Sequence, residues 1–316
     1  MTLPLPYRVF RGLTWVAWKL GKTPTAEQFL ATPREKRAAE RPPRWALRPP
    51  PADVRYEDRD VPTRDAKVRV RIYTPARLTG RGILYIHGGG FMLGSIESCH
   101  HIMLDLASKT GDVIVSVDYR LAPDDPFPAG LDDCCSVLRW IEREAAALGI
   151  DRARIAVGGD SAGGGLAAAV AQRAHDEGGP PLALQLLVYP MIDDRTVLRT
   201  DLDPDGVYLW SPASNRYGWT AYLGHAPTVA DARPYAAPAR RTDLSGLAPA
   251  WIGVGDLDLF HDEDVDYAHR LEQAGVPCEL YVAPGMWHGA PSMLPSAPTT
   301  AAMRDSMTDA VRKAVG

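Results

Sequence analysis

Short apolar runs alternate with helical stretches through most of this 316-residue chain. The runs typical of buried strands are residues 83–86, 113–117, 154–159, 182–190, 250–255 and 278–283. Helical stretches lie near residues 98–110, 128–148, 161–177 and 262–274. Because this alternation is typical of a mostly parallel sheet flanked by helices on both faces, we predict an α/β fold. Residues 67–75 alternate apolar and basic side chains, which indicates one half-exposed strand before these runs.

The segment of residues 192–245 interrupts this alternation, because it contains no clear strand. Its aromatic residues include Tyr208, Trp210, Tyr217, Trp219 and Tyr222. A long insertion between two core strands is usually functional or disordered, and the aromatic content favours order. We therefore expect residues 192–245 to form part of a helical cap over the carboxyl ends of the strands. Residues 1–50 are expected to form the N-terminal portion of the same cap, and residues 51–316 the main domain.

Charge and hydropathy exclude several classes of partner. The formal net charge is -4 and no long basic run occurs, so we expect no nucleic-acid binding. No apolar run is long enough to span a membrane, and the N-terminus lacks the features of a secretory signal. An amphipathic helix over about residues 7–20 is expected to pack on the body of the protein, without stable membrane insertion.

The cysteines indicate a reducing compartment. The chain has four, Cys99, Cys134, Cys135 and Cys278, with no CxxC pair, and none lies in a motif that would activate a thiol. Together with the missing export signal, this pattern predicts a cytoplasmic protein.

The segment Gly159-Asp160-Ser161-Ala162-Gly163 is a G-x-S-x-G match in an informative context. An apolar strand leads into it and an Ala-rich helix follows, which is the arrangement of a nucleophile elbow. The sharp turn projects the serine hydroxyl above the sheet, and the flanking glycines keep side chains out of the turn. A phosphate-binding loop is excluded because no G-K-[ST] ending or G-x-G-x-x-G pattern is present. We therefore predict Ser161 as a nucleophile.

A second glycine motif, His87-Gly88-Gly89-Gly90, follows the strand of residues 83–86. Glycines let the backbone approach a substrate carbonyl and direct N–H groups at it. We predict an oxyanion hole in which Gly89 and Gly90 are favoured as donors, Gly88 supports them, and Ala162 adds the N–H that follows the nucleophile. His87 is expected to position this loop rather than to act as a base.

A serine nucleophile needs a base, and the base needs an orienting carboxylate. In this architecture the chain order is serine, acid, histidine, which favours His288 in the loop after the last core strand. Of the other downstream histidines, His175 and His269 fall in helices.

The acid should follow the strand of residues 250–255. Asp258 is the favoured acid and Asp256 the alternative, whereas Asp262 is expected to cap the next helix.

At this point the sequence resembles the hormone-sensitive-lipase-like branch of the α/β-hydrolases, the bacterial esterases with an HGGG motif. The matching pieces, in order, are HGGGFMLGS (87–95), DYRLAPDDPFPAGLDD (118–133), GGDSAGGGLAA (158–168), VYPMID (188–193), GDLDLFHDE (255–263) and GMWHG (285–289). One departure is that Leu259 and Phe260 follow Asp258, where the family commonly has proline and leucine.

The resemblance implies an α/β-hydrolase fold with a Ser161, Asp258 and His288 triad. It also implies an oxyanion hole around Gly88, Gly89 and Ala162, with Gly90. Such enzymes hydrolyse short-to-medium acyl esters through an acyl-enzyme, need no cofactor or metal, and often form homodimers. The cap aromatics and Trp287, next to His288 in sequence, suggest an apolar pocket with limited room for a small-molecule ester.

Three other functions remain open on the sequence. An amidase or peptidase could use the same triad. A non-catalytic binder could share the fold, although all three triad residues are present. A metal hydrolase is disfavoured because adjacent His100 and His101 point apart on a helix and no further ligand spacing supports a site.

Overall fold

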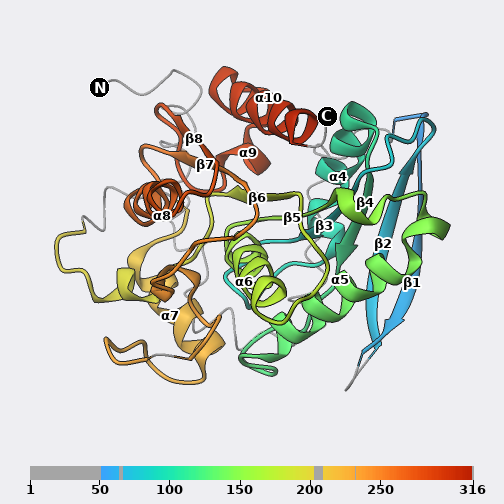
Figure 1. The fold of residues 1–316 in the computed structure, drawn as a ribbon. Coiled ribbons are helices and arrows are strands. Elements are labelled where there is room, and N and C mark those ends of the chain that lie inside the picture. The colour runs from blue at the N-terminus through green and yellow to red at the C-terminus, as the bar shows by residue number, and fades with distance from the viewer. Residues whose placement is uncertain (1–50, 64–66, 203–208, 232, 315–316) are drawn as a thin grey trace.

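The computed structural model describes residues 51–63, 67–202, 209–231 and 233–314 (Figure 1). The predicted N-terminal cap portion, residues 1–50, lies outside the described residues. An eight-stranded sheet runs through the molecule in the order β1-β2-β4-β3-β5-β6-β7-β8. Its strands are β1 Val54–Pro62, β2 Lys67–Pro75, β3 Gly82–Ile86, β4 Val113–Val117, β5 Ile155–Asp160, β6 Leu184–Val188, β7 Ala250–Gly255 and β8 Cys278–Ala283.

The sheet is parallel from β4 to β8 and antiparallel only where β1 pairs with β2 and β2 with β4. The predicted α/β class is thereby confirmed. The α-helices are α4 Ile96–Thr110, α5 Ala129–Leu148, α6 Ala162–Asp176, α7 Pro212–Leu223, α8 His261–Gln273, α9 Ala290–Met293 and α10 Pro298–Lys313. Single turns of 3₁₀ helix lie at η2 Arg152–Arg154, η3 Asp194–Leu198 and η4 Pro238–Arg240.

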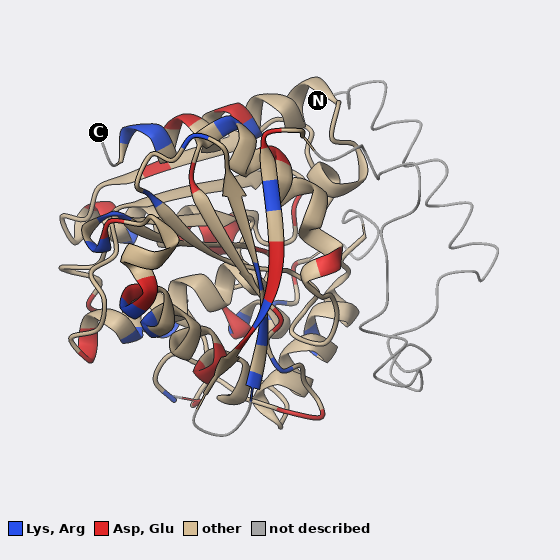
Figure 2. Cartoon of the chain, turned by 90° about the vertical axis from the view of Figure 1, so that its right-hand side faces the viewer, with Lys and Arg blue, Asp and Glu red and all other residues tan. Residues whose placement is uncertain are grey.

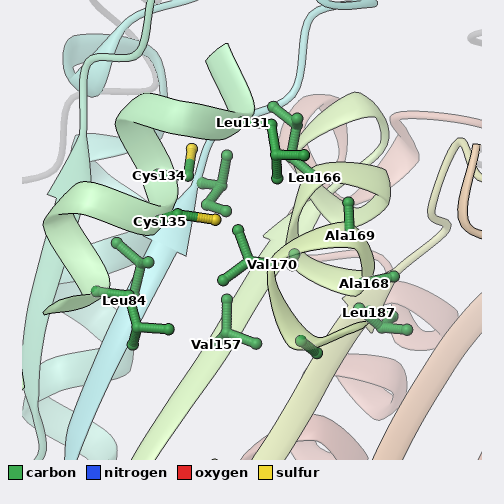
Figure 3. Packing of buried hydrophobic residues seen from close by; sticks show 14 of the residues in the cluster. Leu84, Leu131, Cys134, Cys135, Val157, Leu166, Ala168, Ala169, Val170 and Leu187 are labelled. Carbon is green, nitrogen blue, oxygen red and sulfur yellow. The ribbon is translucent and has the colours of Figure 1, made fainter. Parts of the chain in front are cut away.

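Both faces of the central strands β3 to β7 are buried, which explains their near-continuous apolar sequences. Within β3, Leu84 and Ile86 join the core cluster that contains α5, α6 and α8, whereas Ile83 and Tyr85 join the cluster of α4 and α10. This alternation follows from the two-residue repeat of a strand. Figure 3 shows the first cluster from close by, with Leu84, Val157 and Leu187 of three neighbouring strands below α5 and α6.

The vicinal cysteines of α5 are part of this packing. Cys134 and Cys135 are free thiols buried on the side of the helix that faces the sheet and α6 (Figure 3). Burial raises the pKa of the Cys135 thiol to about 12, so the thiol stays protonated. Both therefore serve as small apolar side chains, in agreement with the absence of an activating motif.

The β1 strand forms one edge of the sheet and is the most polar of the strands. Six successive side chains, from Arg55 to Asp60, are exposed, and five of them are charged. Figure 2 views the molecule from this side and shows basic and acidic residues following one another along the edge. Charged side chains on an edge strand oppose pairing with a further strand, because they would have to be desolvated.

None of the described helices is long and apolar enough to cross a membrane.

The insertion between β6 and β7 is tied together at its base. The Ile192 carbonyl accepts the Ala239 N–H at 3.1 Å, and Arg240 forms two hydrogen bonds with the buried Asp194 carboxylate, of 2.6 and 2.9 Å. Glu263 of α8 accepts the N–H of Ile192 at 2.9 Å. We call these contacts the neck of the insertion. They fix both of its ends against the helix that follows the predicted acid.

A close backbone contact places α6 against β3. A Cβ atom at Gly163 would lie 2.1 Å from the Ile86 carbonyl oxygen and 2.5 Å from that of His87. Since both neighbours are main-chain atoms, neither can turn aside as a side chain would. Only glycine fits at this position.

We predict that Gly163→Ala lowers the free energy of unfolding by about 3 kcal/mol, because the added methyl group overpacks a backbone contact. Urea denaturation would measure the change. Gly179→Ala is the matched control, since its Cβ would lie no nearer than 3.3 Å to a neighbour, and it should cost under about 1 kcal/mol. Equal losses in the two variants would contradict the role of the contact.

Candidate active site

Ser161 occupies the sharp turn between β5 and α6. Its backbone angles are φ 54° and ψ -122°, a strained conformation for a residue with a side chain. Hydrogen bonds of its backbone N–H and carbonyl hold Ser161 in this conformation. The Ser161 N–H donates to the Val188 carbonyl at 2.9 Å, and the Ser161 carbonyl accepts the Met191 N–H at 2.9 Å. The end of β6 thus fixes the turn that presents the hydroxyl group.

His288 lies in the loop between β8 and α9, and its Nε2 is 2.9 Å from the Ser161 hydroxyl oxygen. This loop is held against the end of β7. Asp256 accepts the Gly285 N–H at 2.6 Å, and the Leu257 N–H donates to the Met286 carbonyl at 3.0 Å. Sequence reasoning named Asp256 as the alternative acid, and the structure places it as a support for the histidine loop.

Asp258 is the carboxylate that reaches His288. Its Oδ2 lies 2.9 Å from His288 Nδ1 and its Oδ1 lies 3.1 Å from the same atom. The Phe260 N–H also donates to Oδ1 at 3.0 Å, which fixes the carboxylate. A carboxylate at Nδ1 selects the tautomer with a proton on that nitrogen and leaves Nε2 as the acceptor for a hydroxyl proton.

Asp262 was expected to cap the helix after the acid, and that expectation is wrong. Helix α8 begins at His261, with Phe260 at the cap position, so Asp262 lies inside the first turn. Its exposed carboxylate contacts His261 and Arg199 instead, and these partners, His261 first, lower its pKa. An acidic side chain in the first turn still interacts favourably with the helix dipole.

Aromatic rings surround the His288 imidazole. Tyr189 and Phe260 present their rings edge-on, with centroids 4.8 and 4.9 Å from that of His288. The Trp210 ring lies on a third side, at 6.4 Å. Trp287 does not belong to this group, because its side chain is 2% exposed and packs in the core cluster that contains α10. Trp287 is therefore a core residue, whereas Trp210, one of the cap aromatics, lies beside the imidazole.

The three glycines after β3 begin beside Ser161, which Gly88 contacts. Gly89 and Gly90 have positive φ angles of 127° and 59°, which favour glycine. A Cβ at Gly88 would lie 2.5 Å from an Asp160 carboxylate oxygen and 3.2 Å from the Ser161 Cβ. Ala162 is the first residue of α6, so its N–H has no acceptor within the helix. Backbone N–H groups from two segments thus lie next to the serine.

Asp160 connects these two segments. Its carboxylate lies against the Gly88 backbone, where a Cβ atom would be 2.5 Å from Oδ2, and the Tyr85 hydroxyl donates to Oδ1 at 3.2 Å. Burial raises the pKa of the Asp160 carboxyl, against the opposing effect of the His87 imidazole. Sequence reasoning did not assign this residue, because the variable position of G-x-S-x-G carries no signal of what it contacts. Gly88 is thus packed between Asp160 and Ser161, and Gly89 and Gly90 stay the favoured candidates for oxyanion donors.

His87 has the surroundings of a positioning side chain. Its ring stacks on Tyr119 with centroids 4.5 Å apart, and its Nδ1 lies 2.8 Å from the Gly88 carbonyl oxygen. Burial lowers the pKa of His87, which keeps the ring neutral. The Tyr119 hydroxyl donates to the His87 carbonyl at 3.0 Å.

No group of three or more potential metal ligands occurs among the residues that the structure describes.

Comparison with known proteins places these residues in a family context. Residues 83–292 match the alpha/beta hydrolase fold family. The chain is 40% identical over 229 residues to the carboxylesterase NlhH of Mycobacterium tuberculosis, which covers 70% of each chain. It is 38% identical over 250 residues to the ethyl acetate hydrolase of Pseudomonas putida, covering 73% of this chain and 74% of that protein.

Solved structures of esterases also resemble this one. A bacterial heroin esterase superposes with a TM-score of 0.79 at 38% identity, covering 84% of this chain and 86% of its own. The esterase LipW from Mycobacterium marinum gives 0.78 at 36% identity, with 92% and 91% covered.

We predict that Asp160→Ala lowers the free energy of unfolding by about 1–3 kcal/mol, because the Tyr85 hydroxyl loses its acceptor in a buried site and the Gly88 backbone loses a packing partner. Chemical denaturation would measure this loss. Asp262→Ala removes an exposed carboxylate with two partners and should cost at most about 1 kcal/mol. If Asp160→Ala lowers the free energy of unfolding no more than Asp262→Ala does, the Asp160 carboxylate does not connect the glycine loop to the serine turn.

Proposed function

Since the chain belongs to the alpha/beta hydrolase fold family, as residues 83–292 show, we propose that it is a serine carboxylesterase with Ser161 as nucleophile, His288 as base and Asp258 as orienting acid. The observation that carries this proposal is the continuous path from the Ser161 hydroxyl through His288 to Asp258, with contacts of 2.9 Å at each end of the imidazole. The names of the relatives, which are carboxylesterases and esterases, agree with it.

The proposed reaction is acyl transfer in two steps. His288 takes the hydroxyl proton as Ser161 attacks the ester carbonyl, and it then gives that proton to the leaving alcohol. Water attacks the resulting acyl-enzyme with His288 again as base, which releases the acid. Asp258 holds the imidazole in the required tautomer and stabilises the imidazolium that forms in each step.

Charge that develops on the carbonyl oxygen needs fixed donors. We assign these to the N–H groups of Gly89, Gly90 and Ala162, with Gly88, packed against Asp160, as the support. Ala162 lies at the positive end of the α6 dipole, which adds to the stabilisation of an oxyanion. Every step uses groups of this chain, so the proposed chemistry requires no metal or cofactor.

The proposed substrates are small-molecule esters with short-to-medium acyl groups. The insertion of residues 192–245 supports this assignment, because its Trp210 stands beside His288 and restricts the space there. In this proposal the insertion is the part of the cap that covers the site. One relative is named for ethyl acetate, an ester of a two-carbon acid.

We expect Ser161→Ala to abolish hydrolysis of p-nitrophenyl acetate, butyrate, octanoate and palmitate in the presence of EDTA. The wild-type protein should hydrolyse the short esters fastest and palmitate slowest. A spectrophotometric assay of nitrophenolate release would measure both results. Equal rates for the two proteins would remove Ser161 as nucleophile, and a preference for palmitate would contradict the substrate class.

Asp258→Asn should lower kcat by about 10⁴-fold with little change in KM, because the amide leaves the imidazole in the wrong tautomer. Steady-state kinetics with p-nitrophenyl butyrate would measure the effect. Asp256→Asn is the matched control, since this residue binds the Gly285 backbone and does not reach His288, and its effect should be far smaller. A larger loss from Asp256→Asn would reverse the assignment of the acid.

A further inference from the structure

Trp210 lies where the insertion meets the oxyanion glycines. A Cβ atom at Gly90 would lie 2.2 Å from the Trp210 Cη2 and 2.8 Å from its Cζ2, so the indole lies directly on the Gly90 backbone. The same ring stands 6.4 Å from the His288 imidazole, centroid to centroid. The indole therefore packs directly on the oxyanion loop, on a side of the site that also borders the His288 imidazole.

The space for this ring is provided by two glycines on different elements. Gly218 of α7 is the second, since its Cβ would lie 3.3 Å from the Trp210 Cζ2 and 3.0 Å from the Gly90 carbonyl oxygen. Helix α7, Trp210 and the oxyanion loop thus all meet at this point. A side chain at either glycine would displace the indole, so the chain has a built site for a large flat ring at this point.

The start of α7 fixes the orientation of the ring. Ser211 caps the helix by accepting the Ser214 N–H at 3.1 Å, and Pro212 follows in the first turn. Trp210 precedes the cap, and its Nε1 donates to the side chain of Asn215 at 3.3 Å. A contact between the residue before the cap and the fourth helical residue fixes the direction of the entering chain. Asn215 is completely buried, so this acceptor is itself held in place.

We propose that Trp210 is the specificity-determining residue that limits the length of the acyl chain; this inference rests on the esterase function proposed above. In the attack geometry the carbonyl oxygen points at the oxyanion N–H groups, and the leaving oxygen faces His288, which protonates it. Because the indole packs on the Gly90 backbone, we place it on the side of the acyl substituent. Acyl groups that extend past the first few carbons meet the indole.

The test measures kcat/KM for p-nitrophenyl acetate, butyrate and octanoate with the wild type, Trp210→Ala and Trp210→Phe. We expect Trp210→Ala to raise the octanoate-to-acetate ratio at least tenfold, since contacts with single methylene groups already change such ratios 10- to 200-fold. Trp210→Phe keeps a smaller ring and should give an intermediate ratio. An unchanged ratio in both variants would overturn the proposal.

Two controls separate a local effect from a general one. Val229→Ala changes an exposed residue of the same insertion and should leave the ratio unchanged. A series of acetate esters with increasingly large alcohols should respond less to Trp210→Ala than the acyl series does. A gain confined to the alcohol series would overturn the assignment to the acyl side.

The design also distinguishes this inference from the function on which it rests. Ser161→Ala introduced into each Trp210 variant should abolish turnover of every ester. Turnover that survives Ser161→Ala would refute the proposed function. Turnover that depends on Ser161, with an acyl profile that Trp210 does not alter, would refute only the inference. Circular dichroism melting of each variant identifies any that fails to fold, and the conservative Trp210→Phe keeps the test decisive in that case.

Discussion

The site depends on the contact between the first turn of α6 and the carboxyl end of β3. At Gly163 the helix passes so close to the Ile86 and His87 carbonyls that a single methyl group has no room. This approach brings the nucleophile on one segment to the glycines on the other. A looser contact would separate the hydroxyl group from the N–H groups that are proposed to stabilise the oxyanion, and the Asp160 carboxylate would no longer bridge them.

The remaining groups meet at the same place because of the sheet topology. Strands β3, β5, β7 and β8 are parallel, so the loops after them all leave from one edge of the sheet. Ser161, Asp258 and His288 follow three of these strands, and the oxyanion glycines follow the fourth. Ser161 and His288 are 127 positions apart in the sequence, yet this arrangement lets them form a hydrogen bond. The crevice outside the carboxyl ends of strands is the usual ligand site in such sheets.

Much of this arrangement could be predicted from the sequence. The apolar runs located the parallel strands because both faces of the sheet are buried, and the chain order of serine, acid and histidine led to the three side chains that the structure brings together. Local chemistry was harder to predict. Asp262 is the second residue of the helix that it was expected to cap. The packing of Asp160 against Gly88 could not be predicted, because the sequence pattern does not show what Asp160 contacts. The dimer and the cytoplasmic location stay predictions.

Tertiary packing decided which tryptophan stands at the site. Trp287 adjoins the histidine in sequence, but the loop turns its side chain into the core, whereas Trp210 reaches the site from the segment before α7. Neighbours in sequence point in different directions, so adjacency alone could not identify the residue. The contacts with Gly90 and Gly218 became visible only when distant segments were brought together.

The neck brings the two ends of the insertion together. Because Asp194 binds Arg240 and Ile192 binds Ala239, the chain leaves and rejoins the main domain at one closed point, and Glu263 fixes that point to α8. The residues between are not free of the main domain, because Trp210 packs on Gly90 and Tyr222 stacks on Phe91. An exchange of the insertion that leaves the strands intact would therefore still change the surroundings of the oxyanion loop.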